Sequence, residues 1–135
     1  METRPGPDAS RPSEPRVLVV DDDASIREVA QAALELVGGC TVLTAGSGEE
    51  CARTAAAERP DVILLDVMMP GTDGPATQRL LSDDERTSDI PIIYLTAKSD
   101  SVLQQSPPIV RGMILKPFDP IRLMSDVEAL LGWRP

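Results

Sequence analysis

The chain has 135 residues, 41% of them hydrophobic and 26% charged, which is the balance of one ordinary globular domain. Thirteen Lys and Arg against 22 Asp and Glu give a formal net charge of −9, so neither a nucleic-acid backbone nor an anionic membrane is expected as the main partner. The chain contains no histidine, which excludes a Ser/His/Asp triad and a role as phosphohistidine donor.

Residues 1–15 combine four prolines with glycine, serine and charged residues, and they offer no apolar face. This composition predicts a flexible leader, followed by one domain over residues 16–135. The leader lacks the apolar stretch of a signal peptide, and no window approaches the roughly 18 apolar residues of a membrane span. We therefore expect a cytoplasmic protein.

The rest of the chain alternates short apolar runs with helical patterns. The apolar runs predict strands covered on both faces at 17–20, 41–44, 62–65, 92–95 and 113–115. Periodic apolar residues behind capping residues predict helices at 26–37, 48–59, 75–81 and 120–131. A helix is also due between the last two strands, but Pro107 and Pro108 cannot lie inside a regular helix. We expect this fourth helix to be truncated or irregular.

Two of the predicted helices have an inner stripe that can be written down. In the first, it consists of Ile26, Val29, Ala30, Ala33, Leu34 and Val37. In the last, Asp119 is the expected cap and Pro120 the first helical residue, with an inner face made of Ile121, Met124, Val127 and Leu131.

This alternation predicts an α/β fold, a doubly wound five-stranded parallel sheet with right-handed crossovers and helices on both faces. Ligands of such sheets bind beyond the carboxyl ends of the strands. Polar residues follow or end four of the predicted strands, namely Asp21 with its neighbours, Asp66, Thr96 and Lys116. We expect these side chains to converge.

Three carboxylates are expected at this edge of the sheet. Asp21, Asp22 and Asp66 repel one another where the dielectric is low. A hard divalent cation offsets that repulsion, and Mg²⁺ takes carboxylate, water and phosphate oxygens as ligands. A structural alternative stays open, because the acidic run at 21–23 also suits a helix N-terminus, where the dipole favours negative charge.

Lys116 and Thr96 sharpen this interpretation. An unpaired ammonium at the end of a buried strand is costly, so Lys116 needs an anionic partner. Thr96 adds a hydroxyl that can donate to an incoming oxyanion. Carboxylates, a cation, a hydroxyl and an ammonium together suit phosphoryl transfer, with Asp66 as the best-placed nucleophile.

At these residues the sequence resembles the receiver domains of bacterial two-component response regulators. The matching stretches are Val19 to Asp22, then Asp66 with Met69, Pro70, Asp73 and Gly74, then Thr96 and Ala97, and finally Lys116 to Phe118. They occur in the family's order and cover nearly all of 16–131. The resemblance implies the flavodoxin-like strand order 2-1-3-4-5.

The resemblance also implies a role for each residue. Asp66 would accept a phosphoryl group from a sensor histidine kinase or a phosphotransfer protein. Asp22 would bind Mg²⁺ directly and Asp21 through water, with the Met68 backbone carbonyl and the acceptor itself completing the site. Lys116 would pair with the phosphoryl group.

Further expectations accompany the same resemblance. Thr96 would hydrogen-bond the phosphoryl group, and Lys116–Pro117 would be a cis peptide. Apart from its own phosphorylation and dephosphorylation, the protein would not act as an enzyme. Because no output domain follows Trp133, we expect a stand-alone receiver that signals to an unknown partner through protein contacts.

The chain departs from the family at a few positions. Met113 stands three residues before the strand-ending lysine, where receivers often carry an aromatic residue. Met68 and Lys98 lie two residues after the acceptor and after the threonine, at positions that influence the family's dephosphorylation rate. Asp23 matches no ligand position and is expected to cap a helix.

Two other functions are compatible with the sequence. Asp21, Asp23 and Ser25 nearly match the nucleophile motif of haloacid-dehalogenase-like Mg²⁺-dependent phosphatases, but that interpretation leaves Asp66 without a role. It also needs a later acidic ligand, for which Asp119 is a poor candidate. A receiver-fold scaffold that signals without phosphorylation is the third alternative, although it normally goes with a lost site residue.

Overall fold

Five parallel strands form one sheet in the order β2-β1-β3-β4-β5. The structure is a computed structural model, and it describes residues 11–97 and 101–133. The strands are β1 (Arg16–Val20), β2 (Thr41–Ala45), β3 (Val62–Asp66), β4 (Ile92–Thr96) and β5 (Val110–Leu115). The predicted fold class and strand order are confirmed.

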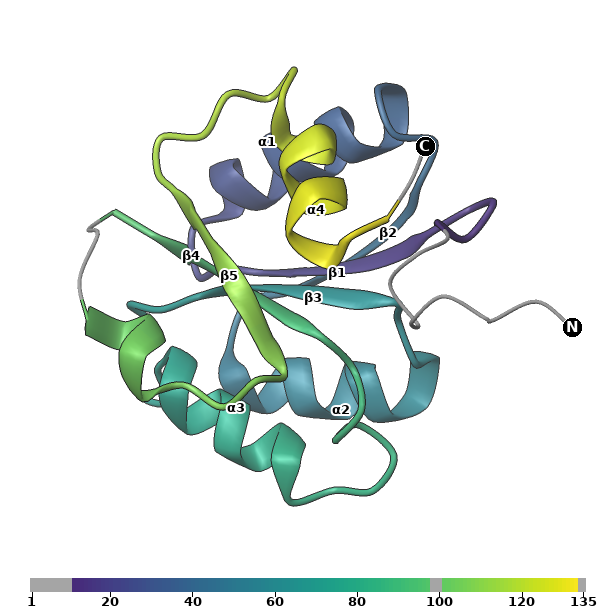
Figure 1. Cartoon of the computed structure of the whole chain (residues 1–135). Coiled ribbons are helices and arrows are strands. Elements are labelled where there is room, and N and C mark those ends of the chain that lie inside the picture. Colours follow the sequence, from purple (N-terminus) through teal and green to yellow (C-terminus); the bar gives the residue numbers. More distant parts are fainter. Residues whose placement is uncertain (1–10, 98–100, 134–135) are drawn as a thin grey trace, which may run out of the picture.

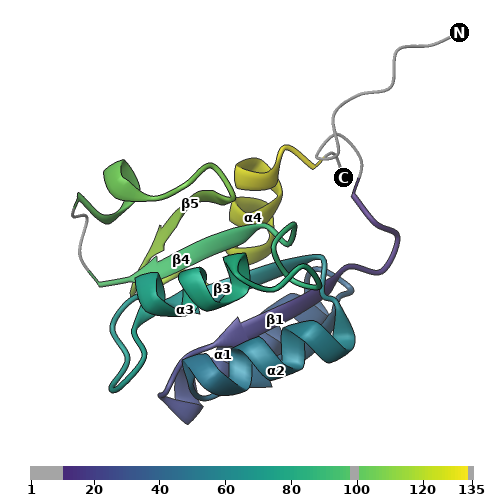
Figure 2. The ribbon, with the colours of Figure 1, turned by 90° about the horizontal axis from the view of Figure 1, so that it is seen from below.

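Helices cover both faces of this sheet (Figure 1). They are α1 (Ala24–Leu36), α2 (Gly48–Glu58), α3 (Gly74–Ser82) and α4 (Leu123–Leu131), with a short 3₁₀ helix η1 (Ser101–Gln105). α1 and α4 lie on one face, and α2 and α3 lie side by side on the other (Figure 2). Because both faces are covered, β3 and β4 are buried along their whole length.

Each face of the sheet has its own apolar core. Alternate residues of β1, such as Val17 and Val19, pack with Leu34, Leu123 and Val127 under α1 and α4. The opposite side of the same strands packs under α2, α3 and η1, in a cluster that contains Leu18, Ile63, Leu65, Leu81 and Tyr94. Among the described residues, no helix is both long and apolar enough to span a membrane.

The segment between β4 and β5 departs from a regular helix, as the prolines predict. Its described residues form η1 and then a turn that leads into β5, while residues 98–100, including Lys98, lie outside the described part. Leu103 and Ile109 attach this segment to the core. The register of β4 and β5 shifts between Ile92 and Ile93.

Tyr94 lies where this segment meets the sheet. It pairs in register with Met113 of β5, and its buried hydroxyl shares a hydrogen bond with Ser106, just after η1. Burial raises the pKa of Tyr94, and the Ser106 hydrogen bond opposes this rise. The chain thus places its one tyrosine in β4, directly beside the methionine that the family resemblance singled out in β5.

The last helix is shorter than predicted. It begins at Leu123, and Ile121 is 71% exposed instead of facing the core. Asp119 does accept a hydrogen bond from the Ile121 amide, at 2.9 Å, but this closes a turn ahead of the helix. The same side-chain chemistry serves turns and caps, which is why the sequence pattern did not separate them.

Two other predicted details were wrong. β5 begins at Val110 instead of at 113. It contains Gly112, with a φ of +153°, and this glycine interrupts the apolar run by which a strand is recognised in the sequence. In α1, Ala30, Ala33 and Leu34 are buried, but Val29 and Val37 are 45% and 52% exposed. They lie at the edge of a stripe that is wider than the contact with the sheet.

Part of the predicted leader contacts the domain. The Arg11 guanidinium donates to the Gly38 carbonyl at the end of α1 and lies 3.5 Å from Glu128 Oε2 of α4. The Thr41 amide donates to the Pro15 carbonyl at 2.8 Å. Residues 11–15 therefore lie against the domain, and residues 1–10 are outside the described part.

Candidate functional site

The carboxyl ends of β1, β3, β4 and β5 bring the predicted site residues together. Asp21 follows β1, Asp66 ends β3, Thr96 ends β4 and Lys116 follows β5. Asp21, Asp66 and Thr96 are all nearly inaccessible, at 1%, 3% and 2% exposure. Their burial follows from the covered sheet, since each lies within or directly beyond a strand enclosed by helices.

Lys116 joins this site by its side chain and by its backbone. Its Nζ lies 2.7 Å from Asp21 Oδ2 and 3.2 Å from Asp66 Oδ1, while its amide donates to the Thr96 carbonyl at 2.8 Å. Burial lowers the pKa of Lys116, but its hydrogen bond and ion pair with Asp21 and the charge of Asp66 outweigh burial and raise this pKa. The lysine is therefore an ammonium held against two carboxylates. The Lys116–Pro117 peptide is cis, as expected.

Asp21 is fixed by contacts to both its side chain and its backbone. Besides Lys116, its Oδ1 accepts a hydrogen bond from the Asp23 amide at 2.9 Å. Its own amide donates to the Ala45 carbonyl at 3.1 Å, and its carbonyl accepts from Arg27 Nη1 at 2.6 Å. This carboxylate is oriented before any ligand arrives.

Opposing effects act on the pKa of the buried carboxylate Asp66. Burial raises its pKa, and the nearby charge of Asp21 raises it further. Lys116 and a hydrogen bond from the Met68 amide to Asp66 Oδ1, at 3.2 Å, lower this pKa but do not outweigh the other two effects. Burial and Asp21 thus disfavour the charged form of Asp66 more than Lys116 and the Met68 amide favour it.

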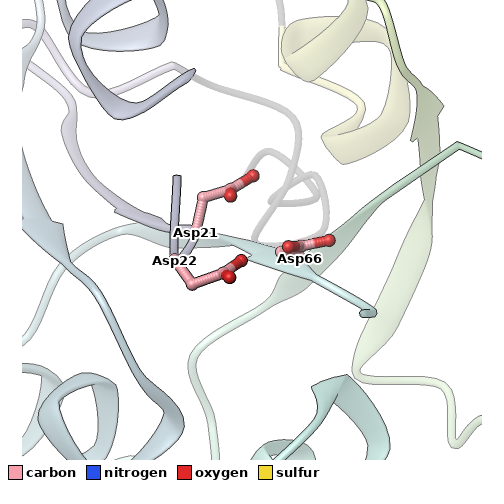
Figure 3. A group of neighbouring side chains, drawn as sticks. All are labelled: Asp21, Asp22 and Asp66. Atoms are coloured by element: carbon pink, nitrogen blue, oxygen red, sulfur yellow. The ribbon is translucent and has the colours of Figure 1, made fainter. Parts of the chain in front are cut away.

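Asp21, Asp22 and Asp66 form a group that suits a cation. Each offers a carboxylate oxygen, and these oxygens lie within 4.8 Å of one another. Figure 3 shows Asp21 and Asp22 reaching from the end of β1 toward Asp66. Asp22 is exposed and the other two are buried, so the group opens to solvent on one side. Hard carboxylate oxygens of this number and spacing fit Mg²⁺, which keeps several waters as further ligands.

The remaining aspartates near the site cap helices. Asp23 accepts from the Ser25 amide at 2.9 Å at the start of α1, and its hydrogen bonds with Ser25 lower its pKa. Asp73 accepts from the Ala76 amide at 3.0 Å at the start of α3. The expected role of Asp23 as a helix cap is confirmed.

Gly74 allows a close approach of backbone behind the acceptor. A Cβ at this position would lie 2.8 Å from Val67 Cα and 3.1 Å from the Asp66 carbonyl oxygen. The Gly74 amide also donates to the Val67 carbonyl at 3.0 Å. The start of α3 is thereby held directly against the end of β3.

Arg27 is the residue at the site that the sequence analysis missed. It lies in the first turn of α1, where a cation is disfavoured by the helix dipole, and it donates to the carbonyl of Asp21. An arginine four residues after an acidic helix cap was a signal in the sequence that could have drawn attention to it.

Comparison with known proteins places this geometry in a family. The model of the response regulator receiver domain matches residues 17–128. The chain is 42% identical over 117 residues to the phosphate regulon transcriptional regulatory protein PhoB of Pseudomonas aeruginosa, covering 85% of the chain and 51% of that protein. It is 39% identical over 123 residues to the DNA-binding response regulator MtrA of Mycobacterium tuberculosis, covering 86% of the chain and 50% of that protein.

Solved structures agree with this assignment. The chemotaxis protein CheY4 of Vibrio cholerae superimposes with a TM-score of 0.80 and 30% identity, covering 87% of the chain and 99% of that structure. The receiver domain of the sensor histidine kinase PA1611 of Pseudomonas aeruginosa gives 0.76 and 27%, covering 89% and 99%. That structure holds a magnesium ion coordinated in its active site cleft.

The chain spans about half the length of the curated relatives it matches. The family match nevertheless extends from β1 into α4 and includes every residue of the acid group together with Thr96 and Lys116. The chain belongs to the response regulator receiver domain family, whose members are regulatory domains of two-component systems.

Proposed function

We propose that this protein is a phosphoacceptor of a two-component phosphorelay and that Asp66 receives the phosphoryl group. The single observation that carries the proposal is the position of Lys116 Nζ, 2.7 Å from Asp21 and 3.2 Å from Asp66. This ammonium lies beside the one carboxylate at the end of β3 and can neutralise oxygens transferred to it. A cation in that position serves a reaction at Asp66 and not at the exposed Asp22.

The proposed reaction moves a phosphoryl group from nitrogen to oxygen. A carboxylate oxygen of Asp66 attacks the phosphorus of a phosphohistidine on a sensor kinase or phosphotransfer protein. The new P–O bond forms as the P–N bond breaks. The electron pair of the broken P–N bond returns to the imidazole nitrogen, which then takes a proton from water. The absence of histidine from this chain fits the receiving side of such a transfer.

Mg²⁺ is the proposed cofactor. We assign Asp21, Asp22, Asp66 and the backbone carbonyl of Met68 as the groups that would hold it. When bound, Mg²⁺ supplies positive charge to the phosphoryl oxygens and offsets the carboxylate repulsion. The grouping of the three carboxylates within 4.8 Å supports this assignment, and burial first and then the charge of Asp21 raise the pKa of Asp66, which a cation would oppose. The magnesium ion in the related PA1611 receiver lends further support.

Thr96 and Lys116 are the proposed ligands of the transferred group. Both lie at the carboxyl edge beside Asp66, and the Lys116 amide is bonded to the Thr96 carbonyl at 2.8 Å. New oxygens on Asp66 would give the lysine a stronger partner and would draw the threonine hydroxyl toward them. We propose that the resulting shift is read by other proteins, since phosphorylation acts by giving existing residues a new charged partner.

The alternatives are less well supported. The phosphatase interpretation needs an acidic ligand after Lys116, but Asp119 is occupied as the cap of a turn and Asp126 lies within α4. It also assigns no function to Asp66, which the structure places in the acid group. PhoB and MtrA are named as transcriptional or DNA-binding regulators. For this chain, a downstream protein partner stays a prediction. Its cytoplasmic location stays a prediction as well.

Intact-mass spectrometry with acetyl phosphate tests the proposal. The wild type is expected to gain the mass of one phosphoryl group in the presence of Mg²⁺ and none in EDTA. Asp66→Asn, which keeps the size of the side chain but removes the nucleophilic oxygen, is expected to gain nothing. An unmodified wild type, or an adduct that persists in the variant, would contradict the proposal and favour a scaffold or a different site.

A further inference from the structure

We infer that Arg27 is a positioning residue of the magnesium site, acting through the backbone of Asp21. The inference rests on the proposed function and assigns a role within that site to a residue that is not itself a ligand. Arg27 Nη1 donates a hydrogen bond of 2.6 Å to the carbonyl oxygen of Asp21. A charged donor to a carbonyl makes a strong, short hydrogen bond.

The contact fixes the peptide that joins two of the proposed metal ligands. The carbonyl of Asp21 belongs to the same planar peptide unit as the amide of Asp22. Holding that oxygen therefore sets the plane from which the Asp22 side chain departs. Asp21 has other restraints, since Lys116 and the Asp23 amide bind its carboxylate. Asp22 is exposed, so the orientation of its backbone matters most for where its carboxylate points.

The guanidinium of Arg27 lies close to a glycine. A Cβ on Gly46, in the loop after β2, would lie 3.3 Å from Arg27 Nη1. The Gly46 amide in turn donates to Glu50 Oε1 at 2.8 Å, which ties the loop to α2. The guanidinium thus lies between the start of α1 and the β2–α2 loop. A larger residue at position 46 would leave less space for it.

The position of Arg27 in its helix argues for a specific role. α1 begins at Ala24 behind its cap Asp23, and the Arg27 amide makes the first turn's hydrogen bond to the Asp23 carbonyl at 3.1 Å. A cation in the first turn opposes the helix dipole. The helix itself gains nothing from a positive charge here, whereas the hydrogen bond to Asp21 does require a long side chain with a donor.

Positioning and electrostatics predict opposite changes in Mg²⁺ affinity when Arg27 is removed. A cation next to a Mg²⁺ site repels the metal, so if charge were the main effect, removing Arg27 would tighten Mg²⁺ binding. If Arg27 orients the Asp21–Asp22 peptide, removing it loosens the site and weakens binding. Residues that orient metal ligands typically contribute about 10 to 100-fold in affinity.

Thermal unfolding in EDTA and in a series of MgCl₂ concentrations separates these effects. The melting temperature in EDTA reports the fold, and its rise with Mg²⁺ reports the dissociation constant through the ligand term in stability. We expect Arg27→Met to raise the dissociation constant for Mg²⁺ by about 10-fold, at the lower end because the arginine acts through the backbone. Arg27→Gln, uncharged and too short to reach Asp21, is a second loss variant should Arg27→Met not fold.

Two variants serve as controls. Arg27→Lys keeps the charge and a donor and is expected to recover most of the affinity. Arg53→Met removes the same charge from an exposed position of α2 and is expected to bind Mg²⁺ like the wild type. Unchanged or tighter binding by Arg27→Met and Arg27→Gln would overturn the inference.

Asp22→Asn distinguishes failure of this inference from failure of the proposed function. In one outcome, the melting temperature of the wild type rises with Mg²⁺, and this rise is lost in Asp22→Asn but kept in the Arg27 loss variants. That outcome overturns the role of Arg27 alone. A wild type that does not respond to Mg²⁺, in the same way as Asp22→Asn, overturns the metal site and the inference together. Weaker Mg²⁺ binding in the Arg27 loss variants, with Arg53→Met unchanged, supports the inference.

Discussion

The ammonium of Lys116 donates a hydrogen bond of 2.7 Å to Asp21, a residue 95 positions earlier in the chain. This contact joins the loop after the last strand to the loop after the first, across the carboxyl edge of the sheet. It also decides the electrostatics of the site, because the same nitrogen lies 3.2 Å from Asp66. Lys116 contacts two of the three carboxylates, and the excess negative charge of the group is what a metal ion has to balance.

Lys116→Met is expected to destabilise the protein by about 3 kcal/mol, because it leaves Asp21 buried without its cation. Mg²⁺ is expected to restore part of the loss by supplying charge to the same carboxylates. Urea unfolding in EDTA and in MgCl₂ measures both effects. Arg59→Met is the matched control, since it breaks the exposed pair with Asp89 and is expected to lower the free energy of unfolding far less than Lys116→Met does. Equal costs for the two variants would contradict this account.

Asp66→Asn is expected to be more stable than the wild type at neutral pH in EDTA. Burial first, and then Asp21, raise the pKa of Asp66 above its ordinary value of 3.8, so the folded protein holds this proton to higher pH than the unfolded chain does. The wild type therefore loses stability relative to the variant as pH rises from the unfolded pKa through the folded one. Below that window both states are protonated, and the difference should no longer change with pH.

Urea unfolding of the two proteins across acidic and neutral pH checks this prediction. Effects of other titrating groups are shared by both proteins and cancel in the difference. A difference in the free energy of unfolding that does not change with pH, or that favours the wild type at neutral pH, would show that Lys116 fully balances the charge of Asp66.

Gly74→Ala is expected to cost about 2 kcal/mol, because the new Cβ meets the backbone of Val67 and Asp66 and neither can move aside freely. It should also slow phosphorylation by displacing the end of β3. Gly71→Ala is the control for backbone strain: Gly71 has a φ of +77° with open space around its Cβ position, so the cost is about 1 kcal/mol with normal phosphorylation. Chemical denaturation and acetyl phosphate kinetics report the two quantities.

Tyr94→Phe and Ser106→Ala are each expected to cost about 1 kcal/mol, because both remove the hydrogen bond that holds the segment after η1 to β4. The double variant should cost less than the sum of the single variants, since there is one shared bond to lose. A double-mutant cycle by urea unfolding measures this coupling. Fully additive costs would mean that the two hydroxyls act independently.

The overall fold and the convergent site could be predicted because both follow from local pattern. Apolar runs and helical stripes give the alternation, and the alternation places Asp21, Asp66 and Lys116 at one edge of the sheet. Their convergence follows from parallel strands that end at the same edge. The resemblance to receiver domains added the strand order and the role of each residue.

The details that failed depend on tertiary structure. Gly112 and the register shift between β4 and β5 hide the first half of β5 from a periodicity argument. Asp119 makes a turn with the hydrogen bond of a helix cap, which moved the predicted start of α4 by several residues. Arg27 was missed because its partner is a backbone carbonyl, so its place in the first turn of α1 hinted at a special role without identifying the contact.

The central claim is that Asp66 itself carries the phosphoryl group, and residue-level mapping tests it most directly. Treatment with acetyl phosphate and Mg²⁺, followed by borohydride reduction, converts an aspartyl phosphate to homoserine, which tandem mass spectrometry locates in the sequence. The account predicts homoserine at position 66 alone, and none when the phosphodonor or Mg²⁺ is left out. Homoserine at Asp21 or Asp22 instead, or at no aspartate of a folded protein, would contradict it.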